Sequence, residues 1–293
     1  YEIRLSLVGS EMCIRDSNSL VMSGDSRITG CVSKTSGGAA AMFPGTADDR
    51  ITLTGQASLA ENYAANGGGL YLRSLSESLG CSLTLEGETT VRENHASSTG
   101  GGICFSGYRG GGGPASRLTL TGKAAIRGNQ AYHGGGIYFY SSNEGDILDS
   151  STSSPLSQNT AEGNGGAIFM TAVISPAKIH LSGTVIRENR AGTGGALYLL
   201  SDSGYELQAE SCTLEQNSAV SGSSGSGGGL WLQNRSGSHA SRLSFHSCIL
   251  AHNKASAQGG AIALFSGTAA CTFELADCNI TENSASSLSL IHI

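Results

Sequence analysis

Short stretches of alternating apolar and polar residues recur along nearly the whole chain. In eight successive units, an aliphatic residue stands three positions before an Asn. All but the last Asn are followed by a polar stretch and then by Gly-Gly-(Ala/Gly)-(Ile/Leu). Such self-similarity at a nearly constant spacing indicates a repeat architecture. The eight asparagines are Asn62, Asn94, Asn129, Asn159, Asn189, Asn217, Asn253 and Asn283.

Each unit contains three alternating segments, typified by LTLTG, xAxIxxN and GGAIYL. Alternation with period two predicts β-strands, and three short strands per unit predict one triangular coil of a parallel β-helix. The units lack a ten-residue stretch with helical periodicity, which excludes helical repeat arrays. We therefore expect an all-β fold, a right-handed single-stranded parallel β-helix (a three-faced β-solenoid) of about eight and a half coils stacked roughly 4.8 Å apart.

The two ends of the chain break this pattern, and both resemble translated sequencing-adapter DNA. Residues 12–17 (MCIRDS) can be encoded by DNA whose reverse complement encodes residues 288–293 (LSLIHI). We therefore expect residues 1–17 and 288–293 to be adapter-derived. Residues 18–287 would then be one β-helix repeat domain, cut from a longer chain whose other coils stack on both ends.

Composition excludes several classes of protein. The chain has 43 Gly among 293 residues but only 4 Pro, and no Gly-x-y period, so it is not collagen-like. Only 14% of the residues are charged, with a net charge of −6 and no basic cluster, so no nucleic-acid partner is expected. No run of 18 apolar residues occurs, so we expect no membrane insertion by this stretch.

The recurring Asn suits a corner between strands. Asn tolerates the left-handed backbone conformation better than other residues except Gly, which predicts that it takes the sharp turn. Stacked Asn side chains can also hydrogen-bond amide to amide along the axis. We therefore expect an asparagine ladder with a structural role.

The GGAIYL segment predicts a surface as well as a core. Its fourth and sixth positions are apolar in every unit and should point inward. The fifth position should then point outward, which predicts an exposed aromatic stripe and a candidate binding surface. The alternative is that these aromatics favour strands and stack on one another, or are covered by loops. The stripe consists of Tyr71, Tyr138, Phe169, Tyr198 and Trp231.

Candidate chemistry is sparse elsewhere. Cys212, Cys248 and Cys278 occupy one position in three successive units, but a line of in-register thiols suits neither a disulfide nor a zinc site, so we expect small buried side chains. The local acid–base cluster at 48–50 is expected in a solvated loop. No catalytic residue, metal site or cofactor is predicted, although polysaccharide lyases and glycoside hydrolases share this fold.

The paired motifs resemble the repeats of chlamydial polymorphic outer-membrane proteins and of the wider β-helical adhesin-like surface proteins. The chlamydial motif has Phe where this chain has Leu, Val or Ile before x-x-N. The resemblance implies a cell-surface or extracellular, non-catalytic scaffold, with glycans or proteins of host or neighbouring cells as partners. The alternatives are a non-catalytic part of a β-helical carbohydrate-active enzyme and a purely structural spacer. The matching residues are 165–168, 194–197 and 259–262, with Asn159, Asn189 and Asn253 before them.

Overall fold

Every regular element that the structure describes is a β-strand. It is a computed structural model, in which the strands form four parallel sheets. The fold class expected from the sequence, an all-β parallel solenoid, is thereby confirmed, with a short fourth sheet in addition to the three long faces. The described residues are 13–14, 19–44, 49–75, 80–107, 115–143, 145–153, 155–222, 224–235, 239–266, 270–287 and 291–292.

The first sheet is built from the LTLTG segments, and the second from the segments that lead to each Asn. The first sheet contains β2 (Ser19–Met22), β5 (Arg50–Leu53), β9 (Ser82–Leu85), β13 (Arg117–Gly122), β17 (Ile147–Thr152), β21 (Ala177–Ser182), β25 (Tyr205–Glu210), β29 (Ser241–His246) and β33 (Cys271–Ala276). The second sheet contains β3 (Arg27–Thr29), β6 (Ser58–Ala60), β10 (Thr90–Arg92), β14 (Ala125–Arg127), β18 (Leu156–Ser157), β22 (Val185–Arg187), β26 (Thr213–Glu215), β30 (Ile249–Ala251) and β34 (Asn279–Thr281).

The short sheet follows each Asn directly, and the third sheet is built from the GGAIYL segments. The short sheet contains β7 (Tyr63–Asn66), β11 (His95–Thr99), β15 (Gln130–Ala131), β19 (Thr160–Ala161), β23 (Arg190–Ala191), β27 (Ser218–Ala219), β31 (Lys254–Ala255) and β35 (Ser284–Ala285). The third sheet contains β1 (Cys13–Ile14), β4 (Ala40–Met42), β8 (Leu70–Arg73), β12 (Ile103–Ser106), β16 (Ile137–Ser141), β20 (Ile168–Ala172), β24 (Leu197–Ser201), β28 (Leu230–Asn234), β32 (Ile262–Ser266) and β36 (Ile291–His292).

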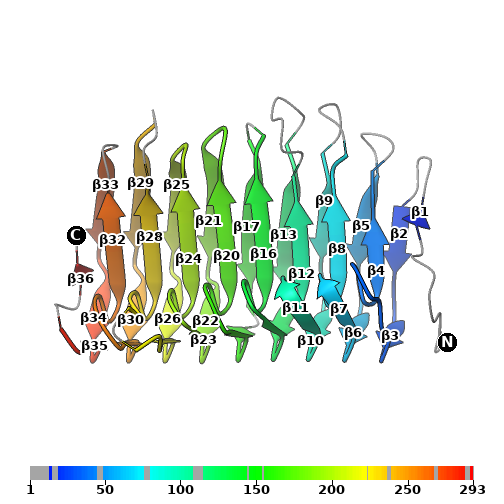
Figure 1. The fold of residues 1–293 in the computed structure, drawn as a ribbon, viewed down its shortest axis with the longest axis horizontal. Helices are drawn as coiled ribbons and strands as arrows, with labels where there is room; N and C mark the ends of the chain where they lie inside the picture. The colour runs from blue at the N-terminus through cyan, green and yellow to red at the C-terminus, as the bar shows by residue number, and fades with distance from the viewer. Residues whose placement is uncertain are drawn as a thin grey trace.

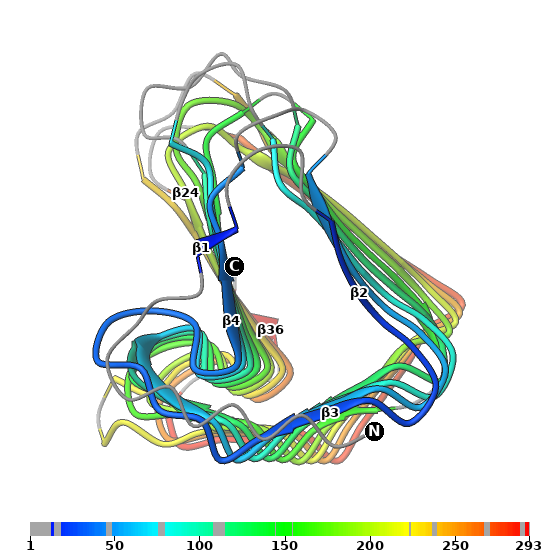
Figure 2. The ribbon, with the colours of Figure 1, turned by 90° about the vertical axis from the view of Figure 1, so that its right-hand side faces the viewer.

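The coils stack in sequence order along one axis, so the molecule is a rod (Figure 1). Viewed along that axis, the three long sheets enclose a triangular interior (Figure 2). The segment that carries the short sheet leaves the corner, bulges outward beside the third sheet and curls back into it (Figure 2). This bulge lies on the outer side of the third sheet, which is the side on which the aromatic surface was predicted.

The core is one continuous column of apolar side chains, most of them aliphatic. The fourth and sixth positions of the GGAIYL segments are buried, as Ile168 and Met170 show with exposed fractions of 0%. Leu181 from the first sheet and Ile186 from the second join the same cluster. The prediction that the fourth and sixth positions point inward is therefore confirmed. Burial of aliphatic surface in every coil is the main source of stability in such a stack.

The asparagine ladder is confirmed at atomic detail. Asn189 donates from Nδ2 to Oδ1 of Asn217 (3.0 Å), while its backbone N–H donates to the same oxygen (3.1 Å). Its second amide hydrogen reaches the backbone carbonyl of Leu156 in the preceding coil (2.9 Å). The same pattern recurs from Asn62 to Asn253, so a polar side chain sits in the interior with its hydrogen-bonding groups paired.

The expectation that Asn itself takes the left-handed turn is wrong. The residue before it does so, as at Glu61 and Glu188, where φ is 57° and 56°. The Asn backbone N–H must point along the axis to reach the next Asn, and the chain therefore turns one residue earlier. Gly128 is the one glycine at this position, with φ of 66°.

The second glycine of each Gly-Gly pair is required by close approach of the backbones of adjacent coils. A Cβ atom at Gly135 would lie 2.5 Å from the carbonyl oxygen of Thr160 and 2.6 Å from that of Gly166. Such distances are far inside van der Waals contact, so only glycine allows adjacent coils to meet here. This explains much of the glycine excess.

Short segments near both ends of the chain form the outermost strands of the third sheet. Cys13–Ile14 and Ile291–His292 pair with β4 and β32 as outermost strands of the third sheet, whereas most of 1–17 and 288–293 lies outside the described residues. The adapter origin of both ends stays a prediction. Within the described residues, no helix is long and apolar enough to cross a membrane.

Candidate functional site

Four aromatic rings stack along the outer side of the third sheet. The strand register places Tyr138, Phe169, Tyr198 and Trp231 directly above one another in consecutive coils. Their ring centroids are 5.1, 4.9 and 4.3 Å apart, with interplanar angles of 6°, 8° and 16°. These spacings follow from the coil repeat, because in-register residues of parallel strands lie about 4.8 Å apart. We call these four residues the aromatic column.

The expected exposure of the stripe is wrong, although its outward direction on the sheet is as expected. Tyr71, Phe169, Tyr198 and Trp231 are each no more than 9% exposed, and Tyr138 is half-buried. Each ring covers the faces of its neighbours, so mainly ring edges are left toward solvent.

Tyr71, the fifth predicted member of the stripe, does not join the aromatic column. Cys104 occupies the intervening coil, in register with both Tyr71 and Tyr138. Its thiol contacts Oγ1 of Thr99 at 3.4 Å, and burial raises its pKa to about 12. Tyr71 packs instead against Phe43, with ring centroids 5.8 Å apart. The structure therefore brings four of the five predicted residues together.

The column is electrically neutral over the physiological pH range. Burial raises the pKa of the Tyr198 hydroxyl to about 12, and the nearby Arg235 offsets part of that rise. Burial likewise raises the pKa of Tyr71. The rings and hydroxyl groups of the column itself therefore carry no charge, and Arg235 is a charged neighbour of Tyr198.

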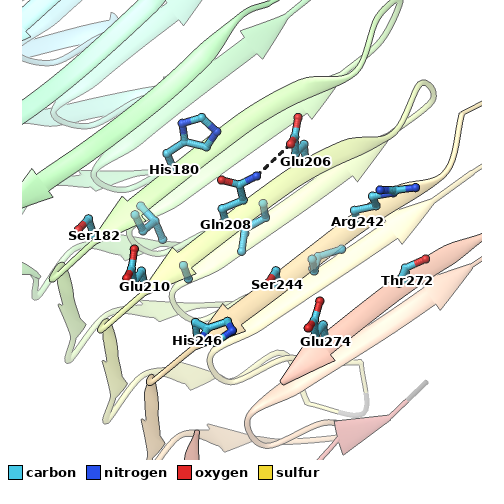
Figure 3. A pocket seen from close by; sticks show the side chains of 14 residues that line it. His180, Ser182, Glu206, Gln208, Glu210, Arg242, Ser244, His246, Thr272 and Glu274 are labelled. Atoms are coloured by element: carbon cyan, nitrogen blue, oxygen red, sulfur yellow. Dashed lines mark hydrogen bonds between the residues drawn. The ribbon is translucent and has the colours of Figure 1, made fainter. Parts of the chain in front are cut away.

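A second surface lies on the outer face of the first sheet, where the sequence analysis predicted no site. A groove of about 880 Å³ crosses strands β21, β25, β29 and β33. Figure 3 shows its side chains standing on the same face of adjacent strands. Gln208 donates to Glu206 (3.0 Å), which also pairs with Lys178 (3.6 Å). The signal in the sequence was the polar residue at every second position of these strands. The labelled polar side chains are His180, Ser182, Glu206, Gln208, Glu210, Arg242, Ser244, His246, Thr272 and Glu274.

The carboxylates of this groove do not form a close catalytic pair. Glu206 and Glu210 come from one strand and stand four residues apart, which is about 13 Å along an extended chain. Glu274 of β33 is in register with Gln208, two strands away, so its backbone lies about 9.6 Å across the sheet and two residues along it from Glu206 and from Glu210. Glycoside hydrolysis needs two carboxyl groups about 5–9.5 Å apart on either side of one bond. The groove is a mixed polar surface.

The acid–base cluster at 48–50 and the metal-ligating side chains are the other candidate chemical groups. The expectation of a solvated cluster at 48–50 is wrong for Asp49, which is 2% exposed, while Asp48 lies outside the described residues. Among the described residues, no three His, Cys, Asp or Glu side chains gather as a metal site requires.

The three successive cysteines form a thiol ladder beside the asparagines. Cys212, Cys248 and Cys278 are free thiols, and the first two are 1% exposed. The backbone N–H of Cys212 lies 3.4 Å from Sγ of Cys248, and that of Cys248 lies 3.4 Å from Sγ of Cys278. Small buried side chains were expected here, and the thiols add weak axial hydrogen bonds to the packing.

The repeat geometry agrees with the comparison to known families. Residues 156–171 match the model of the Chlamydia polymorphic membrane protein (Chlamydia_PMP) repeat. This chain is a β-helix protein with repeats similar to that family. No curated protein and no solved structure is significantly similar to it.

The segment that matches the polymorphic membrane protein repeat covers β18, β19 and most of β20, which are one corner and one strand of the third sheet. It begins at Leu156, three residues before the ladder residue Asn159, and it ends just beyond Phe169 of the aromatic column. The matched segment therefore contains one residue of the asparagine ladder and one residue of the aromatic column.

Proposed function

We propose that the chain is part of a surface-exposed, adhesin-like protein, whose β-helix acts as a rigid scaffold for binding glycans or proteins and performs no chemistry. The match to the polymorphic membrane protein repeat carries this proposal. The name of that family places its members at a membrane, and a stack of in-register coils suits a rod that extends from a cell surface.

The geometry supports a scaffold more than a catalyst. The interior is filled with aliphatic side chains and paired amides, and the outer faces carry long rows of side chains at coil spacing. Such rows present repeated contacts along an extended surface, which is how solenoid proteins bind large partners. The acidic side chains of the groove on the first sheet belong to this surface.

The alternatives are a non-catalytic part of a β-helical polysaccharide lyase or hydrolase, and a spacer. We would immobilise the folded chain and measure its binding to a glycan array and to intact eukaryotic and bacterial cells. Saturable binding that is lost on thermal unfolding is the expected result. Depolymerisation of a polysaccharide would overturn the non-catalytic proposal, and absence of any saturable binding would favour the spacer. Antibodies against the chain should label intact source cells if the surface location is correct.

A further inference from the structure

The aromatic column ends abruptly at one coil. Tyr198 covers one face of Trp231, but the in-register residue on the opposite side is Ala263, which is fully buried. A methyl group stands where the repeat would otherwise place a ring. Phe265, two residues further along the same strand, reaches Trp231 only at a tilt, with centroids 5.6 Å apart and 38° between the planes.

A cavity of about 420 Å³ lies at this break. Tyr198, Trp231 and Phe265 supply its aromatic wall. The opposite wall comes from the outward bulge between the second and third sheets, the segment that curls back beside the third sheet in Figure 2. The polar and small lining residues are Asn164, Thr193, Ser224, Ser226, Gln233, Ala257 and Gln258.

The lining has a distinctive chemistry. It combines aromatic rings with hydroxyl and carboxamide groups, and none of the described residues that line it is charged. Amides and hydroxyls both donate and accept hydrogen bonds, which suits a ligand whose own groups are hydroxyls. Among the described lining residues a ligand ammonium would find no carboxylate, and an extended peptide would find no free sheet edge, because β24, β28 and β32 beside the cavity are each paired on both sides.

We propose that this cavity binds one ring of a neutral saccharide. The apolar face of the sugar ring would lie in the aromatic corner beside Trp231, and its hydroxyl groups would hydrogen-bond with Ser226, Gln233 and Gln258. The volume falls within the range of small-ligand sites. This inference rests on the proposed function, because it names a ligand class and a position for the binding that an adhesin-like scaffold performs.

The chain offers a direct probe of this site. Trp231 is its only tryptophan, so intrinsic tryptophan fluorescence reports on this cavity. We would titrate the folded chain with neutral oligosaccharides selected on the glycan array, and in parallel with tetramethylammonium chloride and an acidic oligosaccharide. A saturable fluorescence change with a neutral sugar is the expected result. A response to the cation or the acidic sugar alone would overturn the proposal.

Two matched variants separate the site from the rest of the rod. Ala263→Tyr continues the column with a ring stacked on Trp231, between the two aromatic residues Trp231 and Phe265 that line the cavity, so affinity should fall at least about tenfold. Cys104→Tyr adds a ring at the other break in the same row of positions, and affinity should change less than about twofold. Circular dichroism and thermal melting would verify that both variants fold.

A third variant covers the case in which Ala263→Tyr does not fold. Gln258→Ala removes a hydrogen-bonding group from the polar wall and should weaken binding by about tenfold. If neutral sugars bind with unchanged affinity in Ala263→Tyr or Gln258→Ala, the site assignment is wrong while the proposed function stands. If the native chain binds neither glycans nor cells, both fail.

Discussion

The asparagine ladder and the aromatic column run side by side through the same coils, yet they differ in how strictly each coil repeats. The ladder uses one residue type in eight successive coils, with the same hydrogen bonds each time. The column uses Tyr, Phe, Tyr and Trp, and is interrupted by Cys104 and Ala263. Directional hydrogen bonds between buried groups require one type of side chain, whereas stacking of outer rings allows several types.

This difference separates scaffold from surface. A buried amide that loses its partner leaves unpaired polar groups in two coils at once, so the ladder cannot vary without loss of stability. A ring in the outer column can be replaced by another ring or by a small side chain, and the change alters the shape of the outer face. Variation is therefore concentrated where a ligand or partner would meet the rod.

The largest effect is expected from breaking the ladder. Asn189→Ala leaves the backbone N–H of Asn159 and the carbonyl of Leu156 without their partners in the interior. We expect a loss of about 3–4 kcal/mol in local stability. Hydrogen exchange of the flanking coils measures this, because a repeat array need not unfold in one step.

Asn283→Ala is the matched control for the ladder. Asn283 accepts bonds from Asn253 and donates to Leu250 and Thr281, but it has no onward bond to a further ladder residue and is 7% exposed. We expect a smaller loss, because Asn283→Ala removes the partners of the equivalent two groups but breaks no bond to a following ladder residue. Equal losses for the two variants would contradict the view that axial pairing on both sides is what makes the Asn indispensable.

The second largest loss of stability is expected at glycines where the backbones of adjacent coils approach closely. Gly135→Ala puts a Cβ against the carbonyl oxygens of Thr160 and Gly166, and we expect it to cost about 2–3 kcal/mol. Gly136→Ala is the comparison variant: a Cβ there would lie 2.6 Å from the carbonyl oxygen of Ala167, but the next coil holds Ala167 at this same position, so we expect a smaller loss than for Gly135→Ala. Chemical denaturation of the two variants side by side would measure the difference; a reversed order would refute this explanation.

The column should tolerate exchange of rings but not their loss. Tyr198→Ala removes stacking on both Phe169 and Trp231, and we expect a loss of about 2 kcal/mol. Tyr198→Phe keeps both contacts and should change stability by less than about 0.5 kcal/mol. Thermal melting and Trp231 fluorescence would measure both variants. If Tyr198→Phe proved as damaging as Asn189→Ala, the contrast between ladder and column would not hold.

The smallest effect is expected at the turn before the Asn. Gly128→Ala meets only ordinary contacts with Glu93 but places a side chain at φ of 66°, so it should cost about 1 kcal/mol. The reverse change, Glu188→Gly, should relieve strain and leave stability equal or slightly higher. Differential scanning calorimetry of both variants tests the sign, and a clear loss for Glu188→Gly would show that its contact with Gln158 (2.8 Å) outweighs the strain.

The sequence by itself determined the repeat, the strands, the inward positions and the identity of the ladder. Those features depend on the order of residues within one coil, and alternation along a strand decides which face each side chain takes. Ile168 and Met170 were predicted inward and Phe169 outward from this alternation alone, and the structure agrees.

Only the tertiary structure decided what covers the outward residues and where the chain turns. Whether Trp231 is exposed depends on Tyr198, 33 positions earlier, and on Ala263, 32 positions later. The pattern of residues within one coil does not predict either contact. The left-handed residue at each corner, the short fourth sheet and the cavity at the end of the aromatic column have the same origin. Each results from contact between coils, because the solvent exposure and backbone geometry of a residue in a stack are set by its neighbours above and below.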